Sequence, residues 1–414
     1  MTVALLKYYE RNQQKSQTKF MKTGYSIRTW RMRLVCPEPI WLDRTEEYFQ
    51  NVVEFYYHLL RQHEELWNSS LFDIQRSLEL LTLAGRDGRQ PTNPLPMGKV
   101  PVYLRRAAIN KASATVKSTQ ELQSGFPEKL EAKVTFFKGM YSDLTDRSIC
   151  LKLWNGEKWI WTDCKLKGRP FPQDGQLMSP TLVKEGRRYL LNIPVKQENS
   201  DARTAKERMA EGTNLCSVRF TNTDTFAVCC ILDEQGKQLA VHTCRGGDAY
   251  RHRCKLLETR IQKSRPNTVG DNSPQPNRKY YMHLKNLSEH YAHQVSREIL
   301  NFCKENQAGI IVLPDYDQNF TRMAMVKSGN FSPLHLSSKI RTNLQYKAWA
   351  EGILVLETRT DGLKDKCAIC GGKVRRKGNE FLCENGHQGN RFLNDARNLG
   401  RKCQDSFFRG SRTK

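Results

Sequence analysis

Four residues near the end of the chain have the types and spacing of ligands for one metal ion. They form two pairs, Cys367 with Cys370 and Cys383 with His387, separated by a basic, turn-rich segment. Thiolate and imidazole are the ligands of small structural zinc sites, where four of them close a tetrahedron. The spacing therefore predicts a zinc ribbon at 362–388. The alternative is that these four residues share no ligand.

The elements that must position this ribbon form an alternating pattern in the back half of the chain. Apolar runs predict three consecutive strands at 215–220, 226–232 and 238–243, and then helices that alternate with strands at 309–313 and 353–357. The ribbon follows the last strand and precedes a terminal helix. The order β-β-β-α-β-α-β-α is typical of a ribonuclease H-like fold. The alternative, an ordinary doubly wound domain, does not open with three strands that lack a crossover helix.

The front half of the chain is predicted to be rich in strands. Residues 26–35 alternate between polar and apolar, and short strand-like runs with Asn-Gly and Lys-Gly turns recur through 132–195. Between them, apolar residues at helical spacing predict helices at 45–64 and 102–119. The fold class is therefore α/β plus β, with a helical insertion in the front module.

The charge of the chain indicates a polyanionic partner. Its 67 Lys and Arg residues exceed its 43 Asp and Glu residues, which gives a formal net charge of +24. Lys and Arg placed against phosphates release counterions, so nucleic acid is the expected partner, and a membrane surface is the alternative. No apolar run approaches the roughly 18 residues of a spanning helix, and no signal peptide is recognised. Most of the 13 cysteines lie in apolar runs, as reduced core thiols do, so we expect a cytosolic protein that binds nucleic acid.

Two segments carry a resemblance to a known family. The three ribbon cysteines and Asn394-Asp-Ala-Arg-Asn398 resemble the zinc ribbon and final helix of the TnpB family, which is related to compact type V CRISPR effectors. The segment 100–109 resembles the helical insertion of that family. The family usually closes its ribbon with a fourth cysteine, and His387 takes that place here.

The resemblance covers the whole chain and implies its division into parts. An N-terminal β-barrel, the wedge domain, is interrupted by a helical recognition insertion, and a RuvC-type domain of ribonuclease H-like fold carries the inserted zinc ribbon. The implied boundaries are 1–36 and 125–198 for the wedge, 37–124 for the insertion, 199–361 and 389–414 for the RuvC-type domain, and 362–388 for the ribbon.

The resemblance also locates a nuclease centre and implies that it is lost. RuvC-type cleavage uses two Mg²⁺ ions about 4 Å apart, which three converging carboxylates must hold. The corresponding positions are Arg219, Pro314 and Phe392, and Asn390 lies where the family often has another Asp. A cation, an imino acid and an aromatic ring cannot bind Mg²⁺, so this ion would be a cofactor only if the nuclease were active.

The alternative is that neighbouring acids substitute for the missing ones. Asp224, Asp315, Asp317 and Asp395 lie close in sequence to the three positions. However, Asp315 points to the opposite side of an extended backbone from residue 314, and Asp395 lies about 60° round a helix from residue 392. Several displacements would have to converge on one point, so we expect catalysis to be lost.

Loss of the acids leaves a basic surface that can follow a nucleic-acid backbone. By the resemblance, its cations would contact an RNA scaffold and a guide–DNA heteroduplex through phosphates, while base pairing reads the sequence. For any single cation, the alternative is a solvated face. The candidate contacts are Tyr103, Arg105, Arg106, Lys111, Lys117, Arg251, Arg253, Lys255, Arg260, Arg375, Arg376 and Arg397.

The resulting hypothesis is an RNA-guided DNA-binding protein of TnpB descent that acts by occupying its target, as a repressor or a targeting module. Its expected partners are a guide RNA, double-stranded target DNA with a short adjacent motif, and a transposase or the transcription machinery. Its expected location is the prokaryotic cytoplasm, at the nucleoid. One alternative is an active RNA-guided endonuclease that uses displaced acids. Another is a guide-independent nucleic-acid-binding accessory protein of a transposon.

Overall fold

The chain forms two compact units, which are described separately. The front unit spans 27–197, and the back unit contains the residues from 198 onward together with those before residue 27. Asp317 and most of the loop expected at 263–278 lie outside the described residues, as do residues 1–23. The computed structural model describes residues 24–85, 88–122, 124–172, 174–199, 201, 203–264, 277–316 and 332–408.

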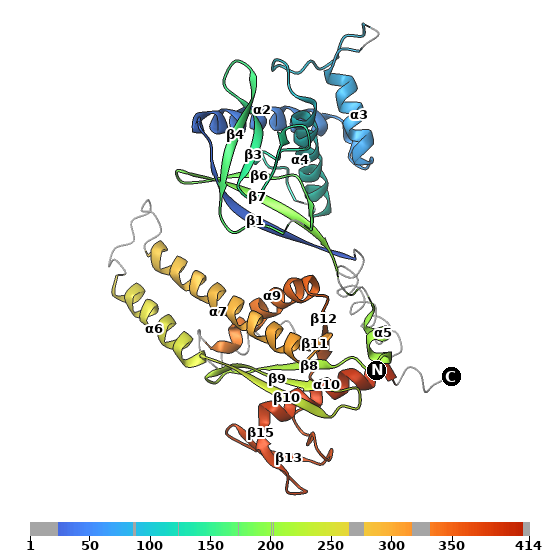
Figure 1. Cartoon of the computed structure of the whole chain (residues 1–414), viewed down its shortest axis with the longest axis vertical. Helices are drawn as coiled ribbons and strands as arrows, with labels where there is room; N and C mark the ends of the chain where they lie inside the picture. The colour runs from blue at the N-terminus through green and yellow to red at the C-terminus, as the bar shows by residue number, and fades with distance from the viewer. Residues whose placement is uncertain are drawn as a thin grey trace. The chain divides into compact units, whose positions relative to one another are not determined.

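The front unit is built on a seven-stranded sheet (Figure 1). Its strand order is β2-β3-β4-β1-β7-β5, and β6 pairs with β7. Because β2 and β5 lie at opposite ends of this order, the predicted β-barrel is present as an open half-barrel. The strands are β1 (Tyr25–Val35), β2 (Tyr141–Ser142), β3 (Ser148–Trp154), β4 (Trp159–Lys167), β5 (Gln176–Leu177), β6 (Thr181–Glu185) and β7 (Arg188–Glu198).

Three helices lie between β1 and β2 in the sequence, where the helical insertion is expected. The two predicted helices are present as α2 (Pro39–Gln62) and α4 (Val102–Glu121). A third helix, α3 (Leu71–Thr82), was not predicted. It begins after Ser70, whose hydroxyl accepts a hydrogen bond from the Asp73 amide. A short 3-10 helix, η1 (Glu64–Leu66), separates α2 from α3.

None of the helices in the described ranges has the length and apolar character of a membrane span.

The back unit contains a five-stranded sheet with the order β10-β9-β8-β11-β12. Strand β9 is antiparallel to both β8 and β10, whereas β11 is parallel to both β8 and β12. All five strands agree with the predicted ranges within two residues. They are β8 (Leu215–Phe220), β9 (Thr225–Leu232), β10 (Gln238–Arg245), β11 (Ile310–Asp315) and β12 (Leu354–Arg359).

Helices cover both faces of this sheet, with α7 and α9 on one face and α10 on the other (Figure 1). A short helix, α5, precedes the sheet. The strands and helices of the sheet follow one another in the predicted order. The helices are α5 (Ala205–Ala210), α6 (Gly247–Lys263), α7 (Arg278–Glu305), the 3-10 helix η2 (Pro333–Leu336), α9 (Ser337–Ala350) and α10 (Arg391–Phe408).

The alternation along β8 decides which side chains reach α10. Cys216, Val218 and Phe220 pack in the core beneath α7 and α9, whereas Leu215 packs in the core beneath α10. Successive side chains of a strand point to opposite faces. Arg219 has the parity of Leu215, so its side chain lies on the α10 side of the sheet.

A glycine brings α10 unusually close to this face. A Cβ atom at Gly400 would lie 2.5 Å from Leu232 Cδ1 and 3.0 Å from Leu215 Cδ1, closer than side chains pack. The absence of a side chain therefore lets the helix backbone approach β8 and β9 directly. This approach brings the first turn of α10 within reach of side chains from the sheet.

One buried cation holds the start of the back unit to the sheet. Arg208 of α5 is fully buried, and its guanidinium donates to the carbonyl oxygens of Gly309 at 2.7 Å and Gly352 at 2.6 Å. It also donates to the carbonyl oxygens of Asp201 and Arg203, at 2.6 and 3.1 Å. Because Gly309 and Gly352 precede β11 and β12, this side chain fixes where two parallel strands begin.

We expect Arg208→Met to destabilise the back unit by about 3 kcal/mol or more, because it leaves buried carbonyl oxygens without donors at a cost of roughly 1–3 kcal/mol each. Chemical denaturation measures this change. The matched control is Lys206→Met, which removes an exposed cation from the same helix and should leave the free energy of unfolding within about 0.5 kcal/mol of the parent. Equal stabilities for the two variants would contradict this assignment.

Candidate functional site

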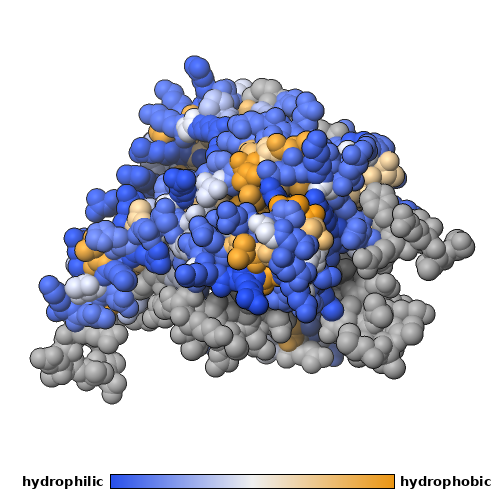
Figure 2. All heavy atoms as spheres, turned by 90° about the horizontal axis from the view of Figure 1, so that it is seen from below, coloured by the Kyte–Doolittle hydropathy of each residue, from blue (hydrophilic) through white to orange (hydrophobic). Residues whose placement is uncertain are grey.

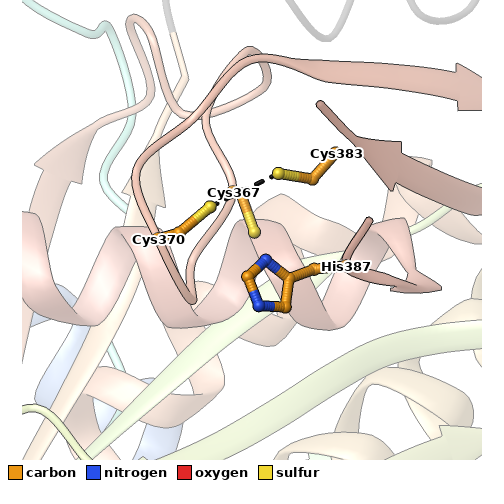
Figure 3. Close-up of side chains that lie close together, drawn as sticks. All are labelled: Cys367, Cys370, Cys383 and His387. Atoms are coloured by element: carbon orange, nitrogen blue, oxygen red, sulfur yellow. Dashed lines mark hydrogen bonds between the residues drawn. The ribbon is translucent and has the colours of Figure 1, made fainter. Parts of the chain in front are cut away.

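The four predicted metal ligands lie together on a small three-stranded sheet (Figure 3). Cys367 and Cys370 come from the turn before its first strand, Cys383 ends the second, and His387 precedes the third. Their ligand atoms all lie within 4.8 Å of one another. The three strands are β13 (Val374–Lys377), β14 (Glu380–Cys383) and β15 (Gln388–Asn390).

The surroundings of these atoms fit a soft divalent cation. The amides of Ile369 and Asn385 donate to the sulfurs of Cys367 and Cys383 at 3.4 and 3.3 Å, an arrangement that stabilises thiolates. Hydrogen bonds from the Asn385 side chain and the Gly372 amide to the sulfur lower the pKa of Cys370 to about 6.

The fourth candidate ligand is the imidazole of His387. The Nδ1 atom of His387 is buried without a hydrogen-bond partner among the described residues. Figure 3 shows the Cys367 sulfur directed toward this ring. Three sulfurs and one imidazole can therefore hold a zinc ion, which would fix the turn and the strands that supply them.

Two asparagines of the motif at 394–398 fasten this ribbon to α10. The Asn394 side chain accepts from the Ala368 amide and donates to the Lys366 carbonyl, each at 2.8 Å. Asn398, one turn later on the same face, donates to the Lys366 carbonyl at 2.8 Å. The spacing of the motif thus has a structural cause, since both amides reach the turn that carries the first pair of ligands.

Removal of one ligand should release the metal. We expect Cys370→Ser to lose most of the zinc that the parent binds and to unfold the ribbon at a lower temperature, because metal binding and local folding are coupled. Metal content by mass spectrometry and thermal melting measure both effects. The control is Cys150→Ser in the front unit, which should keep one zinc per chain. A Cys370→Ser protein with the parent's zinc content would show that this cluster is not the metal site.

A second site lies where β8, β13 and the first turn of α10 meet. Asp395 of α10 is 2% exposed, and each of its carboxylate oxygens faces a different arginine. Oδ1 accepts a hydrogen bond from Arg376 Nη2 at 2.5 Å, and Oδ2 lies 3.3 Å from Arg219 Nε. Arg219 arrives here because of the alternation of β8, and Arg376 arrives from the ribbon. Within the described part of the chain, Asp395 is the one acid at this point, and it is shared by two cations.

Aromatic side chains complete the walls of this site. The Nη1 atom of Arg219 donates to the Tyr316 hydroxyl at 3.1 Å, and its guanidinium lies 5.8 Å from the centre of that ring. Burial raises the pKa of Tyr316 above its usual range. The Arg391 guanidinium lies 4.6 Å from the centre of the Phe392 ring. Asn390 begins α10 by accepting from the Phe392 amide at 2.9 Å.

These side chains enclose a pocket of about 180 Å³. Among the residues that the structure describes, four cations and one carboxylate contribute to its wall, a net charge of three positive. We call it the cationic pocket, and its polar lining among the described residues consists of Arg219, Thr221, Asn222, Tyr316, Lys364, Arg376, Arg391 and Asp395.

Two of the three positions that the resemblance assigns to a nuclease centre line this pocket. Arg219 and Phe392 both line it. Pro314 is buried in β11, where it has the parity of Ile310 and Val312, two residues that pack in the core beneath α10. It therefore lies on the same side of the sheet as the pocket.

The proposed substitute acids are not brought together. Asp315 has the parity of Ile311 and Leu313, which pack beneath α7 and α9. On that face, burial and the nearby charge of Asp315 raise the pKa of Glu357. Asp395 lies on the other face. Asp224 is exposed, and its carboxylate accepts from the Asp248 amide at 3.0 Å, at the start of α6. Asp317 lies outside the described residues.

Another group of ligand-type side chains, which the sequence did not indicate, occurs between β10 and α7. His242, Cys244 and Glu298 lie within 4.8 Å of one another. The Nε2 atom of His242 lies 2.6 Å from Glu298 Oε1, so these two side chains satisfy each other. The neighbouring Cys229 thiol, together with burial, raises the pKa of Cys244. This group is therefore explained by packing and hydrogen bonding.

The candidate nucleic-acid contacts on α4 differ in exposure, and one of them is corrected. Arg105 is buried, and its guanidinium donates to Glu79 from Nε at 3.2 Å and from Nη2 at 3.1 Å. It therefore joins α4 to α3 instead of facing a ligand. Arg106 binds the same carboxylate but stays exposed. The remaining candidates on this helix are the exposed Tyr103 and Lys111 and the half-buried Lys117.

The candidates of the back unit also divide by their partners. Arg253, Lys255 and Arg260 are exposed on α6, whereas Arg251 pairs with Asp248. In the ribbon and α10, Arg375 is exposed, Arg376 binds Asp395, and Arg397 donates to Gln238 Oε1 at 2.6 Å. Hydrophilic residues dominate the face of the molecule in Figure 2, with smaller apolar groups between them.

Tyr316, Lys364 and Arg391, which line the cationic pocket, were among the residues missed from the sequence. Tyr316 follows the end of β11, and Lys364 lies three residues before the first zinc ligand. Arg391 directly precedes Phe392, a position that the resemblance had already marked. That adjacency is the one local signal that could have revealed it.

Asp395 should act as a structural carboxylate. We expect Asp395→Asn to destabilise the back unit by about 3 kcal/mol, because breaking a buried ion pair leaves charges without compensation. Thermal or chemical denaturation of the full chain measures this loss. A carboxylate kept for metal binding would behave in the opposite way, since its removal relieves strain, so an unchanged or raised stability would contradict the structural role.

Comparisons with known proteins agree with this architecture. Residues 26–155 match the model of the Aq_aa04 family. No curated protein matches the chain. A solved structure described as a Cas12f1-sgRNA-target DNA complex is similar over 91% of this chain and 99% of that chain, with a TM-score of 0.53 and 12% sequence identity.

A second solved structure, the mini-RNA-guided endonuclease CRISPR-Cas phi3, gives a similar result. It matches over 95% of this chain and 97% of that chain, with a TM-score of 0.51 and 9% identity. At such low identity the likeness concerns the fold. The chain therefore has the fold of compact, TnpB-like type V effectors.

Proposed function

We propose that this chain is an RNA-guided DNA-binding protein of TnpB descent whose nuclease centre is lost. Its fold is shared with proteins whose structures are described as an sgRNA–target DNA complex and as an RNA-guided endonuclease. The net charge of +24 suits two nucleic-acid partners. The observation that supports the loss of cleavage is that Arg219 and Arg376 already pair with the two oxygens of the Asp395 carboxylate.

The back unit supports a ribonuclease H-like assignment. Its strand order places β8 in the middle of the sheet, with β9 and β10 to one side and β11 and β12 to the other. The acids of a RuvC-type centre would project from β8, from the end of β11 and from α10. In this chain Arg219 of β8 and Phe392 of α10 line the cationic pocket, and Pro314 of β11 lies on the same side of the sheet.

The charge of this pocket opposes a divalent ion. Two unit charges 4 Å apart near a protein surface interact by about 4 kcal/mol, and a divalent ion doubles that figure. A Mg²⁺ ion would meet four cations there, and its natural ligand Asp395 is engaged by two of them. Two-metal cleavage needs carboxylates that outweigh such repulsion.

The division into parts follows the same proposal. The wedge domain would comprise 1–36 and 125–198, with the recognition insertion at 37–124. The RuvC-type domain would comprise 199–361 and 389–414. The zinc ribbon at 362–388 would hold Arg376 in the pocket wall, because β13 begins four residues after Cys370.

The biological role that fits this chemistry is occupancy of DNA. A guide RNA would select the sequence by base pairing, and the protein would hold the duplex beside a short motif. Bound in this way, the protein would block transcription or recruit a partner such as a transposase or the transcription machinery. It would act in the prokaryotic cytoplasm, at the nucleoid.

Purified protein with its co-purified RNA should bind a matched DNA duplex in Mg²⁺ without nicking or cutting either strand. Sequencing of that RNA defines the matched duplex, and a duplex of unrelated sequence is the control. Cleavage that disappears in Asp315→Ala and Asp395→Ala variants would establish the active endonuclease instead. Binding that is equal for both duplexes and survives removal of the RNA would indicate the guide-independent accessory protein.

A further inference from the structure

In the described part of the cationic pocket, the positive charge exceeds what the one acid, Asp395, can balance. Arg219 and Arg376 share Asp395, whereas Lys364 and Arg391 have no ion pair among the described residues. Cations that serve only to replace metal ligands would not need to gather in this number. The surplus indicates a site for an anion.

Two donors in this region lack an acceptor. The Nε atoms of Arg219 and Arg391 are buried without a hydrogen-bond partner among the described residues. Arg219 Nε lies 3.3 Å from Asp395 Oδ2, but the contact does not have hydrogen-bond geometry. Buried donors are almost always paired, and an arginine donor is best satisfied by an anionic oxygen.

The size of the pocket limits the anion. At about 180 Å³ it is smaller than the roughly 300–1,000 Å³ of sites for drug-sized ligands. It can take one phosphate group but not a whole nucleotide. Guanidinium groups suit this role because their planar forks match the geometry of phosphate oxygens.

Asp395 positions two of the arginines of the pocket. By binding Arg219 and Arg376 at once, it holds two guanidinium groups from β8 and β13 in fixed positions. Such preorganised cations lose little side-chain entropy when an anion binds. The carboxylate therefore positions the pocket, and the free cations Lys364 and Arg391 supply most of the charge.

We propose that the cationic pocket binds one backbone phosphate of target DNA, so that arginine and lysine hold the strand at the point where metal ions would hold it in a nuclease. This inference rests on the proposed function, because DNA is taken as the polyanion. The site would lengthen occupancy of the target without any chemical step.

The test variant is Lys364→Gln combined with Arg391→Gln, which removes the two cations that do not bind Asp395. The matched control is Lys206→Gln combined with Lys377→Gln. Both residues are exposed, Lys206 on α5 and Lys377 on β13 with the parity opposite to Arg376, and neither lines the pocket. Both variants lose two charges, and zinc content with thermal melting shows whether each is folded.

Binding of the RNA-loaded full chain to its matched duplex is measured across a range of salt concentrations. One lost phosphate contact lowers the slope of log K against log [salt] by about 0.9 for duplex DNA and about 0.7 for a single strand. We expect this decrease and several-fold weaker binding for the pocket variant. The control variant should fall by clearly less.

A second measurement locates the phosphate. Single neutral methylphosphonates are placed at successive positions of each DNA strand. One position should weaken binding of the parent and have no further effect on the pocket variant, because both changes remove the same contact. Additive effects at every position would overturn the inference. The inference would also fail if methylphosphonates weakened binding when they were placed in the guide RNA and at no position of the DNA.

Failure of the inference is distinct from failure of the proposed function. If the parent shows no RNA-dependent DNA binding, the function itself is wrong. If the parent binds its matched duplex and the pocket variant binds with the same slope and affinity, the pocket does not hold a phosphate and the function stands.

Discussion

The back unit depends on one electrostatic constraint, the buried carboxylate of Asp395 between two guanidinium groups. A buried charge is tolerated only when it is paired. Here the strand β8 supplies Arg219, the helix α10 supplies Asp395, and the ribbon supplies Arg376. The parity of β8 brings Arg219 to this point, and Gly400 brings α10 close to the sheet. The Cys/His cluster supports the third member, because it organises the turn that leads into β13 and Arg376. The candidate metal site and the ion cluster are therefore parts of one structural unit.

The same constraint gives the pocket its chemistry. A frame of this topology can gather three carboxylates on one side of its sheet, where they would hold Mg²⁺. Under the proposed function, a cation, an imino acid and an aromatic ring occupy those positions, and Asp395 is shared by two arginines. What is left is a small cavity with a net charge of three positive. By the proposal, such a cavity would attract a backbone phosphate of DNA and repel the Mg²⁺ ions that cleavage requires.

Much of this arrangement could be predicted from local sequence. The five strands of the back unit are apolar runs, and the metal ligands follow a regular spacing, so both were found. Helix α3 was missed because it exposes Phe72 and Leu80, which blurs its apolar face. Charge alone could not separate the buried Arg105 from the exposed Arg106 beside it. The meeting of Arg219, Arg376 and Asp395 joins residues far apart in the chain, and only tertiary packing decides it.

The most direct measurement is anomalous diffraction from crystals of the full chain grown with Mn²⁺, which replaces Mg²⁺ and can be located by its scattering. The account predicts no Mn²⁺ in the cationic pocket, with both oxygens of Asp395 facing Arg219 and Arg376. An anomalous peak beside Asp395, with either guanidinium turned away from it, would contradict the account.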